Sequence, residues 1–341
     1  MGASADKPDQ PEIAGHQIVS LCMNPALDIT TSTPDIRPTD KLRCQGVRYD
    51  PGGGGINVAL VADVLGVPAL AVFPAGGPAG QVVHSLLVAD GLAIHRIPIG
   101  GSTRESFTVN ETSTTRQYRF VLPGPELTLA EQTECLLALR RAAATSRGGR
   151  PEVVVASGSL PPGVPHDFYQ EISNTCAEMG ATFLLDTSGG GLTNIKSGVF
   201  LLKPSLRELR EALGQELQTE AEQLAAAREL IARGVSRYVL VSMGVDGALL
   251  ATPDGGHRFP PVEVPPGSGV GTGDAMVAGV AVGLTRGWPL TRAVRLGIAA
   301  GAAMLLTPGS APCTREDAER LFKKTAEPAV IKVAADSSAD R

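Results

Sequence analysis

The sequence has few of the residues that build disulfide frameworks, zinc sites or nucleic-acid surfaces. Its 341 residues include only five cysteines, one tryptophan and 4% aromatic residues in all. The cysteines are odd in number and form no CxxC pair, which argues against a disulfide framework or zinc knuckle and for a reducing compartment. Positive charge is not in excess, since the net charge is −5, so nothing attracts nucleic acid or acidic membranes.

Long apolar runs and targeting signals are also missing. The first sixteen residues are polar and lack the apolar core of a signal peptide. We expect residues 1–16 and 328–341 to be flexible tails. The apolar stretches 275–286 and 297–306 are interrupted by glycine and are too short to span a bilayer. The sequence therefore predicts a cytoplasmic protein with neither membrane nor nucleic-acid partners.

Hydrophobic residues make up 43% of the chain, which is enough for a sizeable core, and their pattern predicts alternating strands and helices. The predicted buried strands are residues 18–23, 70–74, 153–157, 182–186, 199–203 and 238–242. The predicted helices between them include residues 56–65, 80–89, 129–144, 165–179, 205–213 and 219–232. This alternation is typical of a three-layer α/β/α fold, a mainly parallel sheet with helices on both faces.

Two segments break the alternation with strands that no helix follows. Residues 26–33 and 41–50 are typical of exposed strands, and residues 105–110 and 116–122 flank the turn-like segment ETSTT. These strands predict a small second sheet, a lid over the main domain built from residues of about 26–50 and 103–122. Because one face of this sheet lacks a helical cover, we expect it to pack against a second copy of the chain in a homodimer.

The most informative stretch is SGVGTGDAMVAG, where a glycine-dense loop runs directly into an apolar helix. Free amides in the first helical turn, together with the helix dipole, form a site for anionic oxygen. Gly271, Thr272 and Gly273 would let the backbone approach a phosphoryl group. The Asp274 carboxylate could then accept the proton of an attacking hydroxyl. On this loop alone, Asp274 is equally well explained as an ordinary helix cap.

Further glycines indicate how this loop is supported. Four of them lie inside the helical stretches that follow it, namely Gly279, Gly283, Gly297 and Gly301. Each costs about 1 kcal/mol relative to alanine in a helix interior, so we expect two closely packed helices beneath the loop.

Two other nucleotide-binding motifs are not matched by the sequence. Residues 190–197 resemble a Walker A motif but have Ile195 where a glycine is required, and no GxGxxG fingerprint follows the first strand.

Polar and glycine-rich segments near strand ends indicate a substrate site. The segment NPALD follows the first strand, and its Asp28 would bind two sugar hydroxyls or would serve only as a turn aspartate. The segment PGGGGINVA places four glycines before a helix with Asn57 in its first turn, which favours close ligand approach over a flexible turn. Ser157, at the end of another strand, offers a hydroxyl to the same edge of the sheet.

Three cations lie on the predicted lid strands. Taken singly, Lys41, Arg43 and Arg104 are typical of solvated surface charges. Together on one lid, they could hold the phosphate of a substrate through charge-assisted hydrogen bonds.

These motifs resemble those of the ribokinase-like PfkB sugar kinases over residues 17–325. Both family signatures occur, as PGGGGINVA and the late GTGDAMVAG. The segments NPALD, KLRC, YRFVLPG and SGSLPPGV look most like the minor bacterial ATP-dependent 6-phosphofructokinase branch of that family. The resemblance implies a ribokinase-like fold and ATP-dependent phosphorylation of fructose 6-phosphate at its 1-hydroxyl. Fructose 1-phosphate and tagatose 6-phosphate are the alternative acceptors, because kinases for them share much of the pattern.

The resemblance also implies a role for each matching residue. Asp274 would be the catalytic base and Gly271, Thr272 and Gly273 the anion hole. Sugar-phosphate contacts are implied for Asp28, Lys41, Gly52, Gly53, Asn57, Arg104 and Ser157. Contacts with ATP are implied for Lys203, Ser205, Ser242, Gly244 and Gly247. Arg104 could reach across from a partner's lid.

Two cations are implied in the same way. Glu208 would order water on a magnesium ion, although Ser205 stands where the family's NxxE motif has asparagine. Some relatives hold potassium, mostly through backbone carbonyls, at positions that match Ser268, Val270, Met304, Thr307, Gly309 and Ala311. Two hypotheses from other classes remain open. The chain could be a non-catalytic sugar-phosphate-binding protein, which the retained Asp274 loop argues against, or a dinucleotide-dependent oxidoreductase.

Overall fold

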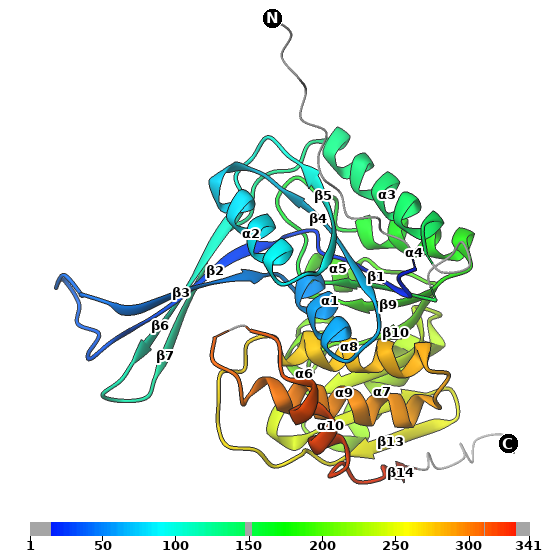
Figure 1. The fold of residues 1–341 in the computed structure, drawn as a ribbon. Helices are drawn as coiled ribbons and strands as arrows, with labels where there is room; N and C mark the ends of the chain where they lie inside the picture. Colours follow the sequence, from blue (N-terminus) through cyan, green and yellow to red (C-terminus); the bar gives the residue numbers. More distant parts are fainter. Residues whose placement is uncertain (1–14, 147–151, 310, 332–341) are drawn as a thin grey trace, which may run out of the picture.

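In a computed structural model of the chain, residues 15–146, 152–309 and 311–331 are described, and they form one ten-stranded and one four-stranded sheet (Figure 1). The parallel part of the large sheet runs, in spatial order, through β5 (Ala93–Pro98), β4 (Ala69–Ala75), β1 (Ile18–Leu21), β8 (Val153–Ser157), β9 (Thr182–Asp186), β10 (Val199–Leu202) and β11 (Ser236–Ser242). All six predicted buried strands lie here and are confirmed, whereas β5 was not predicted. Its sequence, AIHRIP, interrupts the apolar pattern with His95 and Arg96.

Three antiparallel strands extend this sheet beyond β11 and were also missed. They are β12 (Ala248–Thr252), β13 (Gly255–Phe259) and β14 (Ala329–Ile331). Because β14 pairs with β13, the expectation of a loose tail from residue 328 is wrong for residues 329–331.

His16, which we placed in the N-terminal tail, is buried, and its Nε2 forms a hydrogen bond with the Ala142 carbonyl at 2.8 Å. The remaining tail residues, 1–14 and 332–341, lie outside the described part of the chain.

Helices cover both faces of the large sheet, which confirms the three-layer prediction. One face packs against α1 (Gly54–Val64), α2 (Gly77–Ala89), α8 (Thr272–Thr285), α9 (Leu290–Met304) and α10 (Arg315–Phe322). The other face packs against α3 (Leu129–Ala144), α4 (Phe168–Met179), α5 (Gly190–Thr193), α6 (Leu206–Leu213) and α7 (Glu220–Ala232). Alternate strand residues enter the two cores, since Ile18 packs on the first side and Val19 on the second. None of the described helices is long and apolar enough to cross a membrane.

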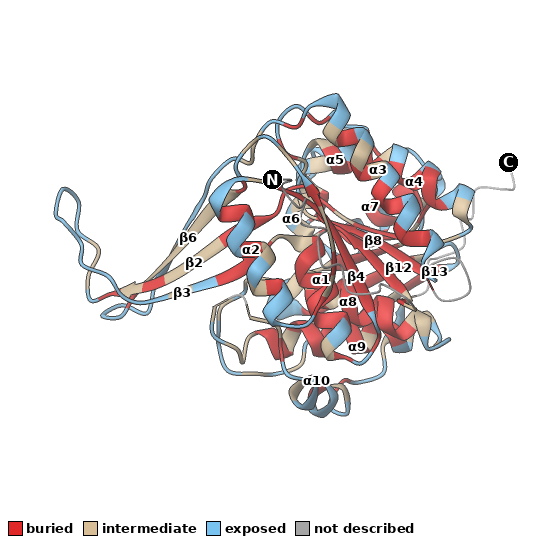
Figure 2. Cartoon of the chain, turned by 45° about the horizontal axis from the view of Figure 1, so that its top comes forward, coloured by how far each residue is buried: buried red, intermediate tan, exposed pale blue. Residues whose placement is uncertain are grey.

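The small sheet has the order β3 (Gln45–Gly52), β2 (Ala26–Thr33), β6 (Arg104–Glu111) and β7 (Gln117–Val121), and it projects from the main body (Figures 1 and 2). Its four strands confirm the predicted lid sheet. The predicted start at residue 41 is wrong, because β3 begins at Gln45. Lys41 and Arg43 therefore lie in the exposed loop between β2 and β3, and not on a lid strand.

The two helices below the glycine-dense loop pack backbone against backbone, as expected. A Cβ atom at Gly279 of α8 would lie only 2.7 Å from the Gly297 Cα of α9. A Cβ atom at Gly301 would lie 2.9 Å from the carbonyl oxygen of Thr272, the first residue of α8. Since almost any side chain would separate the helices, these glycines hold the start of α8 directly against α9.

Candidate active site

The Asp274 carboxylate lies where α8, α1 and β8 meet. Its Oδ2 accepts a hydrogen bond from Asn57 Nδ2 of α1, and its Oδ1 accepts one from Ser157 Oγ at the end of β8, each at 2.9 Å. The helix cap is Gly271 instead, so the explanation of Asp274 as a cap is wrong. Two neutral donors thus hold this carboxylate in one orientation, with acceptor capacity left over for the proton of a bound hydroxyl.

The four-glycine run lies in contact with polar side chains of the site, including those of Asp28 and Ser157. A Cβ atom at Gly54 would overlap the Ser157 hydroxyl and lie 2.9 Å from Asp274 Oδ1. A Cβ atom at Gly52 would overlap the Asp28 carboxylate, and Gly53 has a φ of 114°, which other residues rarely adopt. The glycines are therefore required by the close approach of two carboxylates, which a flexible turn would not need.

The loop before α8 leaves the start of this helix open. Gly271 adopts the left-handed conformation, with a φ of 74°, and no side chain caps the helix. Thr272 Oγ1 donates to the Gly269 carbonyl at 3.0 Å, which braces the loop. Because the first-turn amides carry the positive end of the helix dipole, this opening suits an anionic oxygen beside Asp274.

A buried ion pair that was not predicted lies against this opening. Lys203 Nζ is 3.1 Å from Asp186 Oδ1, with side-chain exposures of 4% and 13%. A Cβ atom at Gly273 would lie 3.2 Å from Lys203 Nζ. Asp186 is the last residue of β9, so an acidic residue ending a buried strand was the available signal.

Burial and neighbouring charges set the ionisation of this pair. Burial raises the pKa of the Asp186 carboxyl to about 7, and Lys203 opposes that rise. Burial alone would lower the pKa of Lys203, but the Asp186 and Glu208 carboxylates raise it, so the amine stays charged. The pair therefore presents a fixed ammonium beside the loop that leads into α8.

The other residues predicted to contact ATP follow Lys203 along the same edge of the sheet. Ser205 caps α6 and forms a reciprocal capping box with Glu208, in which each backbone amide donates to the other side chain at 2.8 and 3.2 Å. Ser205 also bridges to Ser242 at the end of β11. A short 3-10 turn follows from Gly244, and Gly247 closes it with a φ of 84°. The Glu208 carboxylate therefore has one oxygen engaged in the cap.

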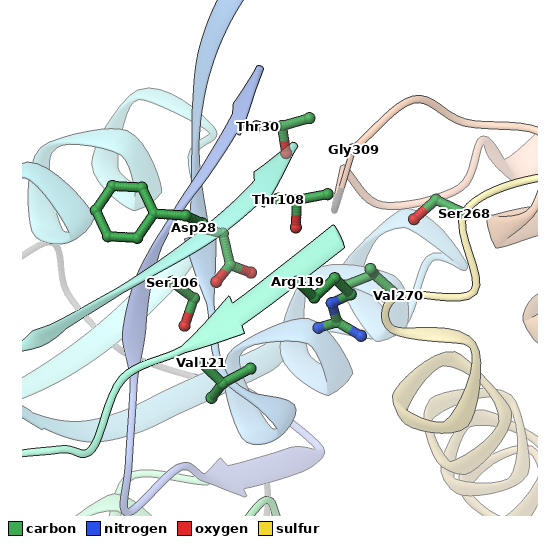
Figure 3. A pocket seen from close by; sticks show the side chains of 10 residues that line it. Asp28, Thr30, Ser106, Thr108, Arg119, Val121, Ser268, Val270 and Gly309 are labelled. Carbon is green, nitrogen blue, oxygen red and sulfur yellow. The ribbon is translucent and has the colours of Figure 1, made fainter. Parts of the chain in front are cut away.

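A pocket lies between the lid and the loops of the main domain (Figure 3). The empty space between its lining atoms is about 320 Å³, and it includes open solvent. Its described lining residues are Asp28, Thr30, Ser106, Phe107, Thr108, Arg119 and Val121 on the lid side and Ser268, Val270 and Gly309 on the other. The predicted sugar-binding aspartate thus faces the same loop that leads into α8.

The structure does not bring the predicted lid cations into this pocket. Arg104 donates from Nη2 and Nε to the Asn24 carbonyl at 3.1 and 3.3 Å, and from Nη1 to the Leu122 carbonyl at 3.3 Å. Lys41 is exposed in the loop between β2 and β3, and Figure 1 shows this loop at the outer end of the lid. Neither residue is among the described lining residues.

After α9, oxygen atoms of the described residues come together around Thr307, and the backbone turns at Gly309, which has a φ of 70°. Thr307 Oγ1 lies 2.9 Å from the Met304 carbonyl oxygen and 3.2 Å from that of Ala311. Ser268 Oγ is buried and has no hydrogen-bond partner among the described residues. A set of carbonyl and hydroxyl oxygens fits a hard monovalent cation, so these residues fit potassium.

The site offers less for a divalent ion held by protein alone. The described residues contain no group of three or more His, Cys, Asp or Glu side chains that could hold a metal ion. Magnesium usually keeps several waters and binds through substrate phosphates with one or two carboxylates. The single carboxylates of Asp186 and Glu208, on the same side of the site as Lys203, fit that second arrangement.

The chain is similar to known carbohydrate kinases. Residues 18–317 match the model of the pfkB family of carbohydrate kinases. The chain is 59% identical over 315 residues to the ATP-dependent 6-phosphofructokinase isozyme 2 of Mycobacterium tuberculosis, covering 92% of this chain and 91% of the relative. It is 36% identical over 275 residues to a 1-phosphofructokinase of Xanthomonas campestris, covering 79% and 84%.

Two solved structures of one Escherichia coli protein share the fold. Phosphofructokinase-2 in complex with potassium superposes with a TM-score of 0.84 at 33% identity, covering 91% of this chain and 99% of the other. The same protein in complex with fructose 6-phosphate gives a TM-score of 0.83 at 32% identity, with the same coverage. The chain therefore belongs to the pfkB family of carbohydrate kinases, which transfer a phosphoryl group to a sugar hydroxyl.

Proposed function

We propose that the chain is an ATP-dependent 6-phosphofructokinase, which phosphorylates fructose 6-phosphate at its 1-hydroxyl to give fructose 1,6-bisphosphate. The observation that carries the proposal is the oriented Asp274 carboxylate beside the open end of α8. The names of its relatives support the acceptor, since the Mycobacterium tuberculosis relative is a 6-phosphofructokinase. A fructose 6-phosphate complex of the Escherichia coli protein supports it as well.

The geometry suggests how the residues share the reaction. Asp28 and Asn57 position the sugar, and Asp274 takes the proton of the 1-hydroxyl as its oxygen attacks the γ-phosphorus of ATP. The bond from that phosphorus to the bridging oxygen breaks, and ADP leaves. The amides of Gly271, Thr272 and Gly273 and the Lys203 ammonium stabilise the charge on the transferring group.

Cations complete the proposed site. Magnesium would be held by the ATP phosphates, with Asp186 or Glu208 contacting its water, and it would neutralise phosphate charge. Potassium would lie within the loop of Met304, Thr307 and Ala311, near the start of α8. Since Ser205 still caps α6 together with Glu208, the change from asparagine leaves this carboxylate fixed in place.

A coupled assay of ADP release tests the acceptor. With magnesium and potassium present, we expect kcat/KM to be highest for fructose 6-phosphate, compared with fructose 1-phosphate and tagatose 6-phosphate. Phosphorus NMR should place the new phosphate on the 1-oxygen. A higher kcat/KM for fructose 1-phosphate would reassign the acceptor within the family. Binding of sugar phosphates without ADP release from any of them would favour a non-catalytic protein.

We also propose that the lid forms a homodimer. One row of cross-strand partners on the lid is entirely apolar, running from Tyr49 through Ile29 and Phe107 to Phe120. Tyr49 and Phe120 are 51% and 55% exposed, which is unusual for large apolar side chains in one patch. The same row of a second copy of the chain would pack on this apolar face and remove it from water.

The double variant Tyr49→Asp/Phe120→Asp should dissociate the dimer. Charges placed on a buried apolar row should raise the dimer dissociation constant by about 100-fold or more, since two central contacts are lost. Light scattering across a dilution series measures this. Gln117→Asp, on the opposite face of β7, is the control and should remain dimeric. A monomeric wild-type chain at micromolar concentration would contradict the proposal.

A further inference from the structure

Two buried hydroxyl groups that take no part in the proposed reaction hold the backbone directly after Ser157. Tyr169 Oη of α4 donates to the Gly158 carbonyl at 2.8 Å, and Thr187 Oγ1, directly after β9, donates to the same oxygen at 3.0 Å. Burial raises the pKa of the Tyr169 phenol, so this hydroxyl keeps its proton and remains a donor. One carbonyl oxygen therefore accepts hydrogen bonds from side chains of two different segments.

Gly158 would otherwise be a flexible link beside the site. Its φ is 110°, which other residues rarely adopt, and a glycine backbone can rotate over a wide range of angles. The Gly158 amide donates to the Asp186 carbonyl at 2.9 Å, which fixes the peptide plane before it. The hydroxyls of Tyr169 and Thr187 fix the peptide plane after it. With both planes held, Gly158 cannot rotate without breaking a hydrogen bond.

Ser157 connects this fixed backbone to the Asp274 carboxylate. Its side chain is buried, and its Oγ donates to Asp274 Oδ1 at 2.9 Å. Its backbone packs against α1, since a Cβ atom at Gly54 would lie 2.8 Å from the Ser157 carbonyl carbon. A rotation at the next residue, Gly158, would shift the Ser157 hydroxyl. The orientation of the Asp274 carboxylate therefore depends on the backbone that the two hydroxyls hold.

The glycine run that resembles a Walker A motif makes room for the same two side chains. A Cβ atom at Gly191 would lie 2.8 Å from Thr187 Oγ1 and 3.0 Å from Tyr169 Cδ2. An alanine at this position would push against both of them. Gly191 is therefore explained by packing beside the two hydroxyls, without a bound nucleotide.

We propose that Tyr169 and Thr187 are positioning residues for the catalytic base. Their hydroxyls fix the Gly158 carbonyl, the fixed backbone orients Ser157, and Ser157 orients the Asp274 carboxylate. This inference rests on the proposed function for the role of Asp274. Tyr169 and Thr187 are only 0% and 3% exposed, so they act through Ser157 and not by touching the substrate.

Removing both hydroxyls in Tyr169→Phe/Thr187→Val should lower kcat by about 10- to 100-fold, because a small misplacement of a reacting group has an effect of this size. KM for fructose 6-phosphate should change less than about threefold, since the loss falls on the reacting step. Thr187→Ser keeps the hydroxyl and should retain the wild-type kcat, whereas Thr187→Val should not. Steady-state ADP release measures these values. Tyr238→Phe, which removes a phenol hydroxyl from β11, is the matched control.

A double-mutant cycle with Ser157→Ala separates positioning of the base from a general loss of structure. If the hydroxyls act through Ser157, Tyr169→Phe/Thr187→Val should lower kcat by less than about twofold once residue 157 is alanine. Urea unfolding of the same preparations shows which variants fold. If the variant that lacks both hydroxyls does not fold, the cycle is measured with Tyr169→Phe, in which Thr187 still holds the Gly158 carbonyl.

Three results would overturn the assignment. An equal fold loss of kcat with serine and with alanine at position 157 would mean that the hydroxyls act independently of Ser157. A wild-type kcat in the folded Tyr169→Phe/Thr187→Val variant would mean that the base needs no such support. A raised KM with unchanged kcat would assign the two hydroxyls to sugar binding. The cycle uses the acceptor that the wild-type chain prefers, so failure of the proposed function appears separately, as full turnover of Asp274→Asn.

Discussion

Replacing Asp274 by asparagine should lower kcat by about 10²- to 10⁴-fold, the range expected for loss of a general base. The asparagine side chain has nearly the same shape and can still accept a hydrogen bond from Ser157 or Asn57, so the fold should persist. It cannot take a proton from the sugar hydroxyl at neutral pH. The loss should therefore fall on kcat, with KM for fructose 6-phosphate nearly unchanged.

The measurement is steady-state ADP release, paired with calorimetric binding of fructose 6-phosphate to the same preparation. Asp254→Asn, in the exposed turn between β12 and β13, removes the same charge away from the site and should keep full activity. Turnover of Asp274→Asn within threefold of the wild type would exclude Asp274 as the base. Loss of sugar-phosphate binding in this variant would instead indicate a structural role for its bonds to Asn57 and Ser157.

Replacing Lys203 by methionine should destabilise the protein in a pH-dependent way. Removing one partner of a buried ion pair typically costs about 3–5 kcal/mol, because the other charge is left uncompensated. The remaining partner here is Asp186, whose pKa is already raised to about 7. Without the ammonium, which is the cation opposing that rise, the carboxyl should hold its proton to still higher pH.

The sign follows from the direction of the Asp186 shift. A carboxyl whose pKa is raised on folding binds its proton more tightly in the folded state, so stability falls as pH rises through the folded pKa. In the wild type this loss ends near the pKa of about 7, whereas in Lys203→Met it should continue above that pH. The destabilisation by the substitution should thus grow by about 2 kcal/mol between pH 5.5 and 8.5.

Urea unfolding at the two pH values measures the difference. The double variant Asp186→Asn/Lys203→Met has no ionisable group left in the pair and should lose the added pH dependence. A destabilisation by Lys203→Met that is equal at pH 5.5 and 8.5 would show that the Asp186 carboxyl does not titrate in this window. Asp186 would then be charged or neutral throughout the range.

Hydrophobic pattern was sufficient to predict the parallel centre of the sheet, and exposed segments around a turn-like sequence predicted the lid strands. Buried parallel strands are continuous apolar runs, and residues 153–157 and 182–186 have the predicted bounds. The antiparallel edge was missed because β14 has only three residues, two of them exposed, and it is a strand through its pairing with β13. Such a strand depends on a partner more than 70 positions away in the sequence.

In the candidate site, too, some residues were predicted from the sequence and others were not. The glycine clusters near Asp274 and Asn57 were a usable signal, because a backbone that approaches other atoms closely leaves few alternatives to glycine. Asp186 and Tyr169 were not found, since a strand-end aspartate and a helix tyrosine become informative only once their neighbours are known. Lys41 was assigned to a lid strand from its threonine-rich and charged surroundings, but the structure places it in the preceding loop.

The backbone contact between Gly279 and Gly297 implies that mutational tolerance will not track distance from the substrate. In a saturation-mutagenesis survey, position 279 should reject even alanine, although it lies on the second turn of α8 and faces another helix. A methyl group there would tilt the helix whose first-turn amides we propose to bind the phosphoryl group. Sites of inactivating substitutions would then form a stripe along the α8–α9 contact, at positions whose side chains face the other helix.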